Sequence, residues 1–399
     1  MNKKFMFWEN PKQAIWYMLG ALLFVGCANV FSASYIRAEA DGSNTSFYLI
    51  RYVVYSVLGL IAMQITRKFS YRHLLSRNAV MGMGAIILLM LILVPFIGLE
   101  SGGARRWLGI AGFTIQPSEF AKLVIIMICS RYLGLLMKKR LPVSFISGDG
   151  MICAGIALVY AVLVQKQPDM GTAAIIVALA FCVFIVAGLP WSQIISVFAL
   201  GAVGAVCLVF GASYRYDRIK VWFNPWIDEA GDGYQMVQSL LSIGSGGLTG
   251  TNWGGGTSKF FYLPEAHTDF AFAVFCQENG FLGACLLMTL FIILGGALLQ
   301  IAVRARDERA FLLAAGISFL IVGQAAANMA MVCGLFPVIG VPLVFISYGG
   351  SSLLASMIAI GLVISVYDEE VKKSEEEIVE QYEERRNDLR VIGRRWQPK

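Results

Sequence analysis

The sequence predicts an all-α, polytopic membrane protein with about ten transmembrane helices. Of its 399 residues, 57% are apolar and only 15% are charged, whereas soluble domains carry about 25% charged residues. A helix needs about 20 apolar residues to cross the hydrocarbon core of a bilayer, and apolar segments of that length recur along the chain. Membrane β-barrels have short alternating strands instead, and the sequence contains no such alternation.

The predicted helices follow one another closely along the chain. The first apolar segment is long and lacks a small-residue cleavage site, so we expect no cleavable signal peptide. The ten segments cover residues 14–35, 48–66, 78–97, 118–136, 149–165, 170–188, 193–210, 270–301, 310–335 and 349–367.

The longest polar segment, residues 211–268, separates the seventh and eighth predicted helices. It contains too many tyrosine, tryptophan and phenylalanine residues for a disordered linker. Such rings prefer the membrane–water interface. We therefore expect a large loop that packs against the outer leaflet, with a short interfacial helix at about residues 233–243.

Lysine and arginine predict the orientation. With the N-terminus inside, the inner segments contain 14 cations and the C-terminal tail contains 8, so that 22 of the 32 lie on one side. Cytoplasmic loops carry such an excess, so we expect both termini in the cytoplasm and the 211–268 loop outside. The net charge of +6 then follows from orientation and requires no nucleic-acid partner.

The chain divides into a membrane domain, residues 1–367, and a charged cytoplasmic tail, residues 368–399. The tail contains ten acidic and eight basic residues, which can form i,i+4 pairs on a helix. A solvated helix is the favoured interpretation, and a dedicated docking element is the alternative.

The cysteines and histidines do not indicate a disulfide framework or a zinc site. All eight cysteines lie in apolar segments, no CxxC spacing occurs, and the chain contains two histidines. Disulfide frameworks and zinc sites need other patterns. The favoured role of the cysteines is that of small apolar filler.

Glu119 and Lys122 lie within the fourth predicted helix. A spacing of three places both on one helix face, and charges in a bilayer are costly unless they are paired or face water. A pair that only neutralises itself is one interpretation, and a pair lining a polar cavity open to the outside is the favoured one.

Asp169, at the start of the sixth segment, either caps that helix or faces the same cavity.

Asp269 lies where the long loop meets the eighth predicted helix. The predicted topology places this junction at the outer membrane surface, where a carboxylate can reach a lipid headgroup whose tail stays in hydrocarbon. The alternative is an N-cap for a helix that begins at about Phe270. We assign His267, two residues before Asp269, to the same cavity.

Some lysine and arginine residues lie in predicted outer segments, although these residues are generally concentrated in the cytoplasmic segments. Arg105, Arg215 and Arg218 are of this kind. The planar fork of arginine suits phosphate, so a diphosphate headgroup is one partner, and phospholipid headgroups or the loop's own acids are the alternatives. The glycine-rich segment 244–256 does not match a nucleotide-binding phosphate loop.

Two further features predict a polar interior. Ser347 lies in residues 336–352, where two prolines and paired glycines break the helix, and broken helix at membrane depth is tolerated where it lines a cavity. Gln324 and Asn328 share one face of the ninth segment, where hydrogen bonding between helices is their expected role.

Five stretches together resemble a known family. They are GARRWLGIAGFTIQPSEFAKL, QPDMGTA, GYQMVQSLLSIGSGGLTG, FFYLPEAHTDFAFA and GLFPVIGVPLVFISYGGSS. Their residues and their order along the chain resemble the motifs of the SEDS family (shape, elongation, division and sporulation). The first and fourth stretches look closer to the FtsW/SpoVE branch of that family than to RodA. Val344 and Gln277 depart from the family's usual residues, which blurs the branch but not the family.

The resemblance implies a peptidoglycan glycosyltransferase that polymerises lipid II at the outer face of the bacterial cytoplasmic membrane, for septal or sporulation wall synthesis. The family's essential aspartate maps to Asp269, its paired acid and lysine map to Glu119 and Lys122, and its QPD aspartate maps to Asp169. A class B penicillin-binding transpeptidase and other division or elongation proteins are the implied partners.

Asp269 is expected to act as general base. The leaving diphosphate needs positive charge, for which Arg215, Arg218, Lys122 and a bound divalent cation (Mg or Mn) are all candidates. No nucleotide is needed, because the diphosphate lipid already activates the sugar.

The rival hypothesis is a flippase for a lipid-linked precursor. It is less favoured because the charged candidates gather at the outer end, and a third hypothesis is a scaffold that docks through the tail.

Overall fold

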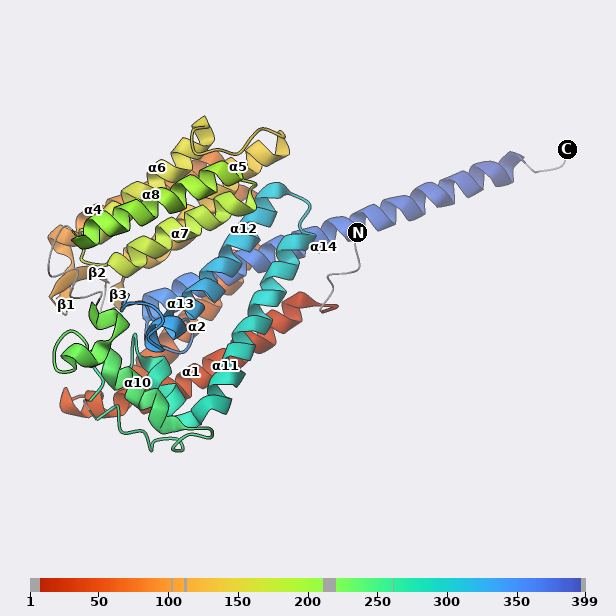
Figure 1. Cartoon of the computed structure of the whole chain (residues 1–399). Helices are drawn as coiled ribbons and strands as arrows, with labels where there is room; N and C mark the ends of the chain where they lie inside the picture. Colours follow the sequence, from red (N-terminus) through yellow and green to blue (C-terminus); the bar gives the residue numbers. More distant parts are fainter. Residues whose placement is uncertain (1–7, 102, 111–112, 211–219, 261, 396–399) are drawn as a thin grey trace.

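The computed structural model describes residues 8–101, 103–110, 113–210, 220–260 and 262–395. It is a bundle of helices from which the end of α14 projects (Figure 1). The elements are α1 (Pro11–Ala40), α2 (Phe47–Lys68), α3 (Tyr71–Leu74), α4 (Arg77–Ile97), β1 (Leu99–Ser101), β2 (Ala104–Ile110), β3 (Phe113–Ile115), α5 (Pro117–Lys138), α6 (Gly148–Gln165), α7 (Met170–Val186), α8 (Trp191–Phe210), η2 (Pro225–Asp228), α10 (Tyr234–Gly246), α11 (Ala271–Arg304), α12 (Glu308–Ser318), η3 (Phe319–Gly323, a π-helical turn), α13 (Gln324–Val332) and α14 (Gly350–Arg395).

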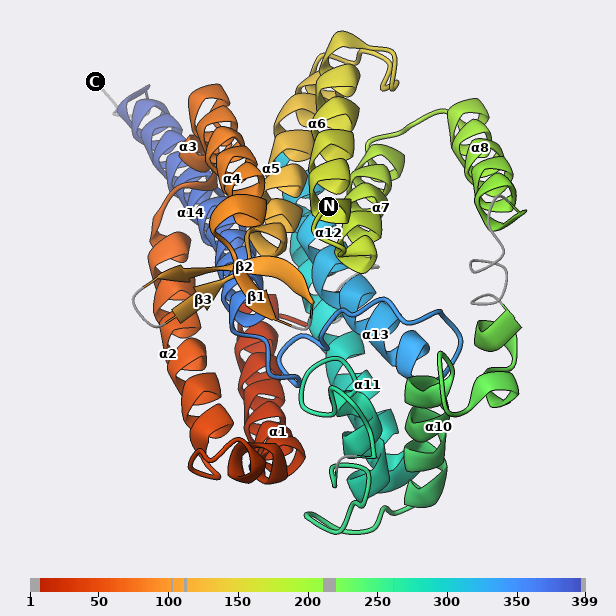
Figure 2. The same ribbon diagram turned by 90° about the vertical axis from the view of Figure 1, so that its left-hand side faces the viewer.

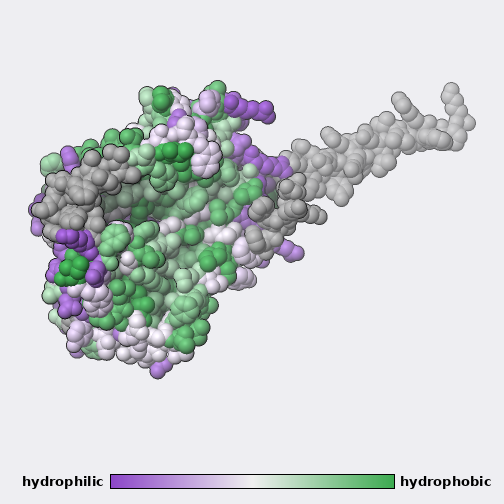
Figure 3. All heavy atoms as spheres, viewed as in Figure 1, coloured by the Kyte–Doolittle hydropathy of each residue, from purple (hydrophilic) through white to green (hydrophobic). Residues whose placement is uncertain are grey.

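Within these residues, eight helical spans are long and apolar enough to cross a membrane, with α12, η3 and α13 forming one of them. Two shorter apolar helices, Met170–Val186 and Trp191–Gly201, correspond to the sixth and seventh predicted segments. Apolar side chains dominate the face seen in Figure 3, and polar ones gather toward its ends. The predicted polytopic helical fold is confirmed, whereas the number of crossings stays a prediction.

The bundle has central and peripheral helices. In α5 and α14, 78% of the apolar window is buried inside the protein, compared with 28% in α2 and α4. Glu119 and Lys122 on α5 are buried and therefore face protein and not lipid. Gln116 and Pro117 begin α5, and a proline is tolerated at this position because its missing N–H would have had no partner within the helix.

The purely helical prediction needs one correction. Residues 99–101, 104–110 and 113–115, expected to lie in an outer loop, form a three-stranded antiparallel sheet in the order β1–β2–β3. Figure 2 shows this sheet across the bundle near α2, α4 and α5. The strands have three to seven residues, too few for a clear alternating pattern, and Arg105 and Arg106 made β2 look like a loop.

Both chain ends lie at the same end of the bundle. Asp368 on α14 forms ion pairs of 2.6 Å with Lys12 of α1 and with Arg67 of α2, and Glu369 pairs with Arg72 at 3.2 Å. The helix continues to Arg395 across the expected boundary between the membrane domain and the tail. The predicted cytoplasmic placement of the termini is consistent with this arrangement.

The short helix predicted at about residues 233–243 is confirmed as α10, whereas its position at the membrane interface stays a prediction. The chain after α10 approaches α11. The helix α11 consists of two segments that meet at Gly280, whose backbone (φ 65°, ψ −168°) is not helical. Hydrogen bonds to α1 reveal the directions of these segments. Gln300, near the end of α11, bonds to Trp8 just before α1, whereas Glu278 and Ala271 bond to Ser32 and Asn29 farther along α1.

The second segment of α11 thus runs antiparallel to α1, but the first segment, residues 271–279, runs parallel to it. Because α1 runs outward in the predicted orientation, the chain enters the protein before residue 271 and returns outward to Gly280. Asp269 therefore lies farther inward than Gly280. The apolar run 270–301 gave no sign of this reversal, and the placement of the Asp269 carboxylate at the outer membrane surface stays a prediction.

A buried ion pair stabilises the reversal of chain direction at Gly280. Lys259 Nζ lies 2.6 Å from Glu278 Oε1, with both side chains almost fully buried. Ser32 Oγ donates to the same carboxylate at 2.6 Å and accepts from Lys259 at 3.1 Å. Two helices and the loop before Asp269 are joined in this way.

We expect Gly280→Ala to destabilise the protein. A Cβ at this position would lie 2.4 Å from Gly250 N and 2.5 Å from Leu248 O, and the positive φ disfavours any side chain. The strain alone costs about 1–3 kcal/mol. Unfolding in detergent measures the effect. Gly155→Ala on α6, where nothing lies within 4 Å of an added Cβ, is the control, and equal midpoints for the two variants would contradict the assigned reversal.

Candidate active site

The polar interior begins with the predicted pair on α5. Lys122 Nζ lies 2.8 Å from Glu119 Oε1 and also donates to Gln324 Oε1 at 2.7 Å. Gln324 in turn donates to Ser352 Oγ and to the carbonyl of Pro342, both at 3.2 Å. The pair is buried, and it connects α5 to α13 and to the start of α14.

Asp169 has both of the roles that its sequence position suggested, helix cap and residue of the polar interior. One of its carboxylate oxygens accepts from the Thr172 amide at 3.1 Å and so caps α7, while the other accepts from Gln116 Nε2 at 3.2 Å. Burial raises the pKa of Asp169, although the bonds to Thr172 and the charge of Arg106 act in the opposite direction. The carboxylate therefore caps its helix and also faces the start of α5.

Asp269 does not cap α11. The helix begins at Ala271 after Phe270, and no side chain caps it. Asn328 Nδ2 donates to the Asp269 carbonyl at 2.7 Å and to the Val341 carbonyl at 2.7 Å. These bonds fix the backbone and leave the carboxyl group free of that task.

The Asp269 carboxyl group lies among other acids. Burial raises its pKa to about 7, and the negative charges of Glu265, Asp169 and Glu119 act in the same direction, while Arg106 opposes them. It also lies close to the broken segment, since a Cβ on Gly340 would be 3.6 Å from Asp269 Oδ2. A carboxyl group with this pKa can accept and release a proton near neutral pH.

The two arginines of β2 have different positions. Arg105, selected from the sequence, is half-exposed and pairs with Glu100 at 3.4 Å. Arg106 instead donates to the carbonyls of Gln167 and Pro168, just before Asp169. Successive residues of a strand point to opposite sides, so the sequence could single out Arg106 only if the strand had been predicted.

His267 and Ser347 hold the loops around Asp269. The His267 ring packs 4.9 Å from Tyr48, and its carbonyl accepts from the Tyr348 amide at 2.9 Å. Burial lowers the pKa of His267, which favours the neutral ring. Ser347 Oγ accepts from the Leu343 amide at 3.0 Å, so this buried side chain serves the turn itself.

Two of the expected site residues, Arg215 and Arg218, lie outside the described residues. Among the described residues, no group of three or more His, Cys, Asp and Glu side chains could hold a metal ion by itself.

Comparison with known proteins identifies the family. The FtsW/RodA/SpoVE description, a cell cycle protein, matches residues 12–372. The chain belongs to this family. It is 36% identical over 345 residues to stage V sporulation protein E of Bacillus subtilis, covering 86% of this chain and 93% of that protein. It is 37% identical over 353 residues to the probable peptidoglycan glycosyltransferase FtsW of Trichlorobacter lovleyi, covering 88% and 91%.

Solved structures of FtsW/RodA/SpoVE-like chains have the same fold. A chain of a peptidoglycan synthase complex, described as coordinating polymerization and crosslinking, superposes with a TM-score of 0.75 and 26% identity over 91% of this chain and 99% of that one. Thermus thermophilus RodA gives 0.64 and 27% over 89% and 96%. The protein is a multi-pass protein of the bacterial inner membrane, and the predicted SEDS resemblance is confirmed.

We expect Arg106→Gln to raise the pKa of Asp269 above its value of about 7, because the arginine is the cation that holds this pKa down. The protonated carboxyl band in infrared spectra, assigned by its loss in Asp269→Asn, measures the titration. Arg105→Gln is the matched control, and it should leave the pKa unchanged. Equal shifts in both variants would contradict the different placement of the two arginines.

We expect Lys122→Met to cost about 3–5 kcal/mol of stability, because it leaves the buried Glu119 carboxylate without its cation. The double variant Glu119→Gln/Lys122→Met removes both charges and should recover most of that loss. Detergent unfolding of the two variants measures the difference. A double variant that is less stable than Lys122→Met would show that the pair does not neutralise itself.

Proposed function

We propose that this chain polymerises lipid II into β-1,4-linked glycan strands at the outer face of the cytoplasmic membrane, with Asp269 as general base. The observation that carries the proposal is the Asp269 carboxyl group, which is half-buried, does not cap its helix and has its pKa raised by burial to about 7. The names of the FtsW relatives, probable peptidoglycan glycosyltransferases, supply the reaction class.

The reaction needs one proton transfer and one displacement. Asp269 takes the proton of the acceptor's GlcNAc 4-hydroxyl while that oxygen attacks the anomeric carbon of the donor's MurNAc. The new C–O bond forms as the bond to the lipid diphosphate breaks, and the diphosphate leaves with the electron pair. A single displacement inverts the α-linked donor to a β-linked product. Base catalysis of this kind contributes roughly 10²–10⁴-fold.

The charges around Asp269 have separate tasks in this proposal. Lys122 is engaged by Glu119 and Gln324, so its first role is to hold α5 and α13 in register. Arg106 lies beside Asp169 and acts on the charge of both aspartates. Arg106 therefore joins Arg215 and Arg218 as a candidate to bind the leaving diphosphate. Arg105, which is half-exposed, is a candidate to bind the substrate at the edge of the site.

A divalent cation fits only one mode of binding here. Mg²⁺ is often held by one or two carboxylates together with substrate phosphates, and Asp169 would be the carboxylate, so that Asp269 stays available as the base. The cation would supply positive charge to the diphosphate. The residues of the chain would still supply the proton acceptor and align the acceptor hydroxyl with the donor sugar.

The flippase alternative has less support. A flippase needs polar groups along a route that reaches the cytoplasmic side. Glu119 lies instead in the first turn of α5 and Asp169 caps the start of α7, and the charges of both act on Asp269. This distribution favours chemistry over transport.

The partners and domains extend the proposal. The related synthase complex is described as coupling polymerization to crosslinking, so we assign a class B penicillin-binding transpeptidase as partner, together with division or elongation proteins. Relatives named for FtsW and for sporulation point to septal or spore wall synthesis. Residues 1–367 form the glycosyltransferase domain in this proposal, and residues 368–399 form a charged cytoplasmic tail.

We expect Asp269→Asn to lower glycan synthesis by roughly 10²–10⁴-fold, with unchanged unfolding in detergent. In the unmodified protein the rate should rise with pH through about 7, because the base must be deprotonated. Purified protein with lipid II, with and without chelator and transpeptidase, measures both effects. Glu265→Gln is the control, and it should keep the activity and move the acid limb to lower pH.

Two outcomes would contradict this assignment. Polymer made by Asp269→Asn at the normal rate would remove Asp269 from the base role. Lipid II translocation in vesicles by unmodified protein that makes no polymer, alone or with its transpeptidase, would favour the flippase.

A further inference from the structure

Three consecutive cations mark the end of α5, at the cytoplasmic surface in the predicted orientation. They are Lys138, Lys139 and Arg140, and all three are exposed. Within the residues that the structure describes, no ion pair engages any of them. The cations that contact α14 are instead paired with its acids. The end of α5 therefore presents a positive charge that the rest of the described chain does not neutralise.

Arg140 has a backbone conformation that usually belongs to glycine. Its φ is 53°. Its amide donates to the Met137 carbonyl at 2.9 Å, and the Leu141 amide donates to the Leu136 carbonyl at 2.9 Å. These two bonds form the Schellman motif, in which glycine usually occupies the position of Arg140. A left-handed conformation is unfavourable for a residue with a Cβ, and an exposed residue held in such a conformation points to a function for its side chain.

The loop that follows these cations is held firmly against α7 and the start of α8. Val143 is buried. Gln193 Nε2 donates to Ser144 Oγ at 2.7 Å, and the Phe145 amide donates to Gln193 Oε1 at 3.0 Å. The Phe145 ring lies 4.5 Å from the Phe184 ring. The cations are therefore carried on a preformed turn, and binding a ligand there requires little further ordering of the chain.

Large apolar side chains are exposed on the same loop and beside it. Leu141 and Ile146 of the loop are 50% and 81% exposed, and Trp191, which begins α8 two positions before Gln193, is 78% exposed. Tryptophan is enriched where headgroups meet hydrocarbon. Basic residues together with such apolar side chains are typical of protein segments that bind at the surface of anionic membranes.

We infer that the turn after α5 binds the headgroup of an anionic phospholipid of the cytoplasmic leaflet. Arginine suits a phosphate oxygen pair through its planar fork, and the two lysines add point charges. Asp149, the next acid along the chain, lies in the first turn of α6, where the helix dipole stabilises it. A soluble phosphate would leave the exposed Ile146 and Trp191 without a role, whereas a lipid uses both the charge and the apolar surface. The inference does not depend on the proposed polymerisation.

Native mass spectrometry of the full chain in detergent measures the binding of phosphatidylglycerol and of phosphatidylcholine with the same acyl chains. We expect phosphatidylglycerol to bind more tightly. Each cation near an anionic lipid surface contributes about fivefold to binding, so Lys138→Gln/Lys139→Gln should lower the phosphatidylglycerol affinity about 20-fold. The matched control is Lys68→Gln/Lys166→Gln, which removes the same charge from two exposed lysines elsewhere. Equal losses in the two double variants would overturn the site.

Arg140→Gly separates binding from folding. Glycine relieves the left-handed backbone, so the midpoint of unfolding in lipid-free detergent should rise. Loss of the guanidinium should lower the phosphatidylglycerol affinity about fivefold in the same variant. Unchanged affinity in Arg140→Gly would overturn the inference. Two competitors test other ligands: displacement of the lipid by inorganic phosphate would identify a free anion as the ligand, and displacement by polyglutamate would identify an acidic protein, and either result would overturn the lipid assignment.

A second measurement locates the lipid in a bilayer. Nanodiscs of phosphatidylcholine receive the same small share of brominated phosphatidylglycerol or brominated phosphatidylcholine, and the quenched fluorescence of Trp191 is the difference between unmodified protein and Trp191→Phe. We expect the phosphatidylglycerol to quench Trp191 more strongly. Lys138→Gln/Lys139→Gln should remove this difference between the two lipids, and Lys68→Gln/Lys166→Gln should preserve it. Equal quenching by both lipids in unmodified protein would overturn the inference.

Discussion

The reversal of α11 at Gly280 is the constraint on which the site depends. Without it, residues 270–301 would form a simple span and Asp269 would lie at its outer end. The buried pair of Lys259 and Glu278, with Ser32, holds the reversed segment against α1. Two buried charges are costly, and hydrogen bonds from a third group make this arrangement tolerable. The reversal places a carboxyl group inside the bundle while the loop around it still comes from outside.

Three other acids within the bundle are paired or bonded, and Asp269 differs from them. Glu119 has Lys122, Glu278 has Lys259, and Asp169 accepts from Thr172 and Gln116. The Asp269 backbone is held by Asn328, but burial and neighbouring acids act on its carboxyl group. Pairing lowers the affinity of a carboxylate for protons and burial raises it. The same interior thus gives the structural carboxylates direct partners and leaves the Asp269 carboxyl group able to take a proton.

The sequence predicts the parts of this site that depend on local spacing. A separation of three placed Glu119 and Lys122 on one face, and a polar residue before an apolar run marked Asp169 as a cap. The resemblance to known motifs selected Asp269. What could not be predicted depends on three-dimensional pairing. Arg105 and Arg106 are distinguishable only once β2 exists, and a single Gly280 in an apolar run does not reveal a reversed chain.

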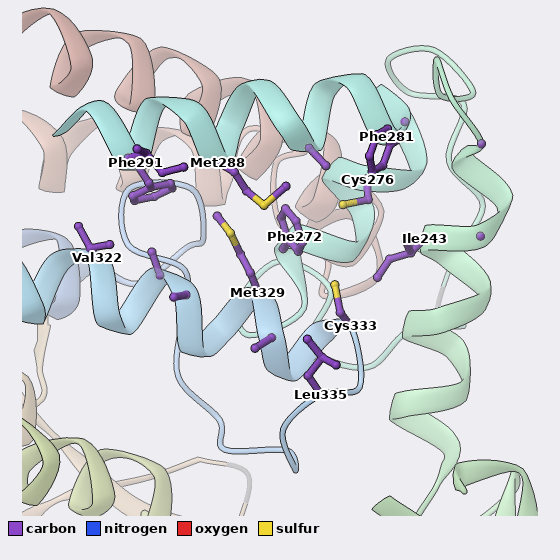
Figure 4. Close-up of a pocket in the computed structure, with 18 residues that line it drawn as sticks. Ile243, Phe272, Cys276, Phe281, Met288, Phe291, Val322, Met329, Cys333 and Leu335 are labelled. Atoms are coloured by element: carbon purple, nitrogen blue, oxygen red, sulfur yellow. The ribbon is translucent and has the colours of Figure 1, made fainter. Parts of the chain in front are cut away.

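Helix α13 has a polar face toward the site and an apolar face on its other side. Its polar face can be buried because Lys122, Pro342 and Asp269 satisfy Gln324 and the Nδ2 group of Asn328. Its other face is small and apolar (Figure 4), so that hydrocarbon can approach within one helix diameter of buried charge. The turn at Phe319–Gly323 is π-helical, and such turns often mark functional sites. It sets the rotation of α13, and this rotation decides which face each environment meets.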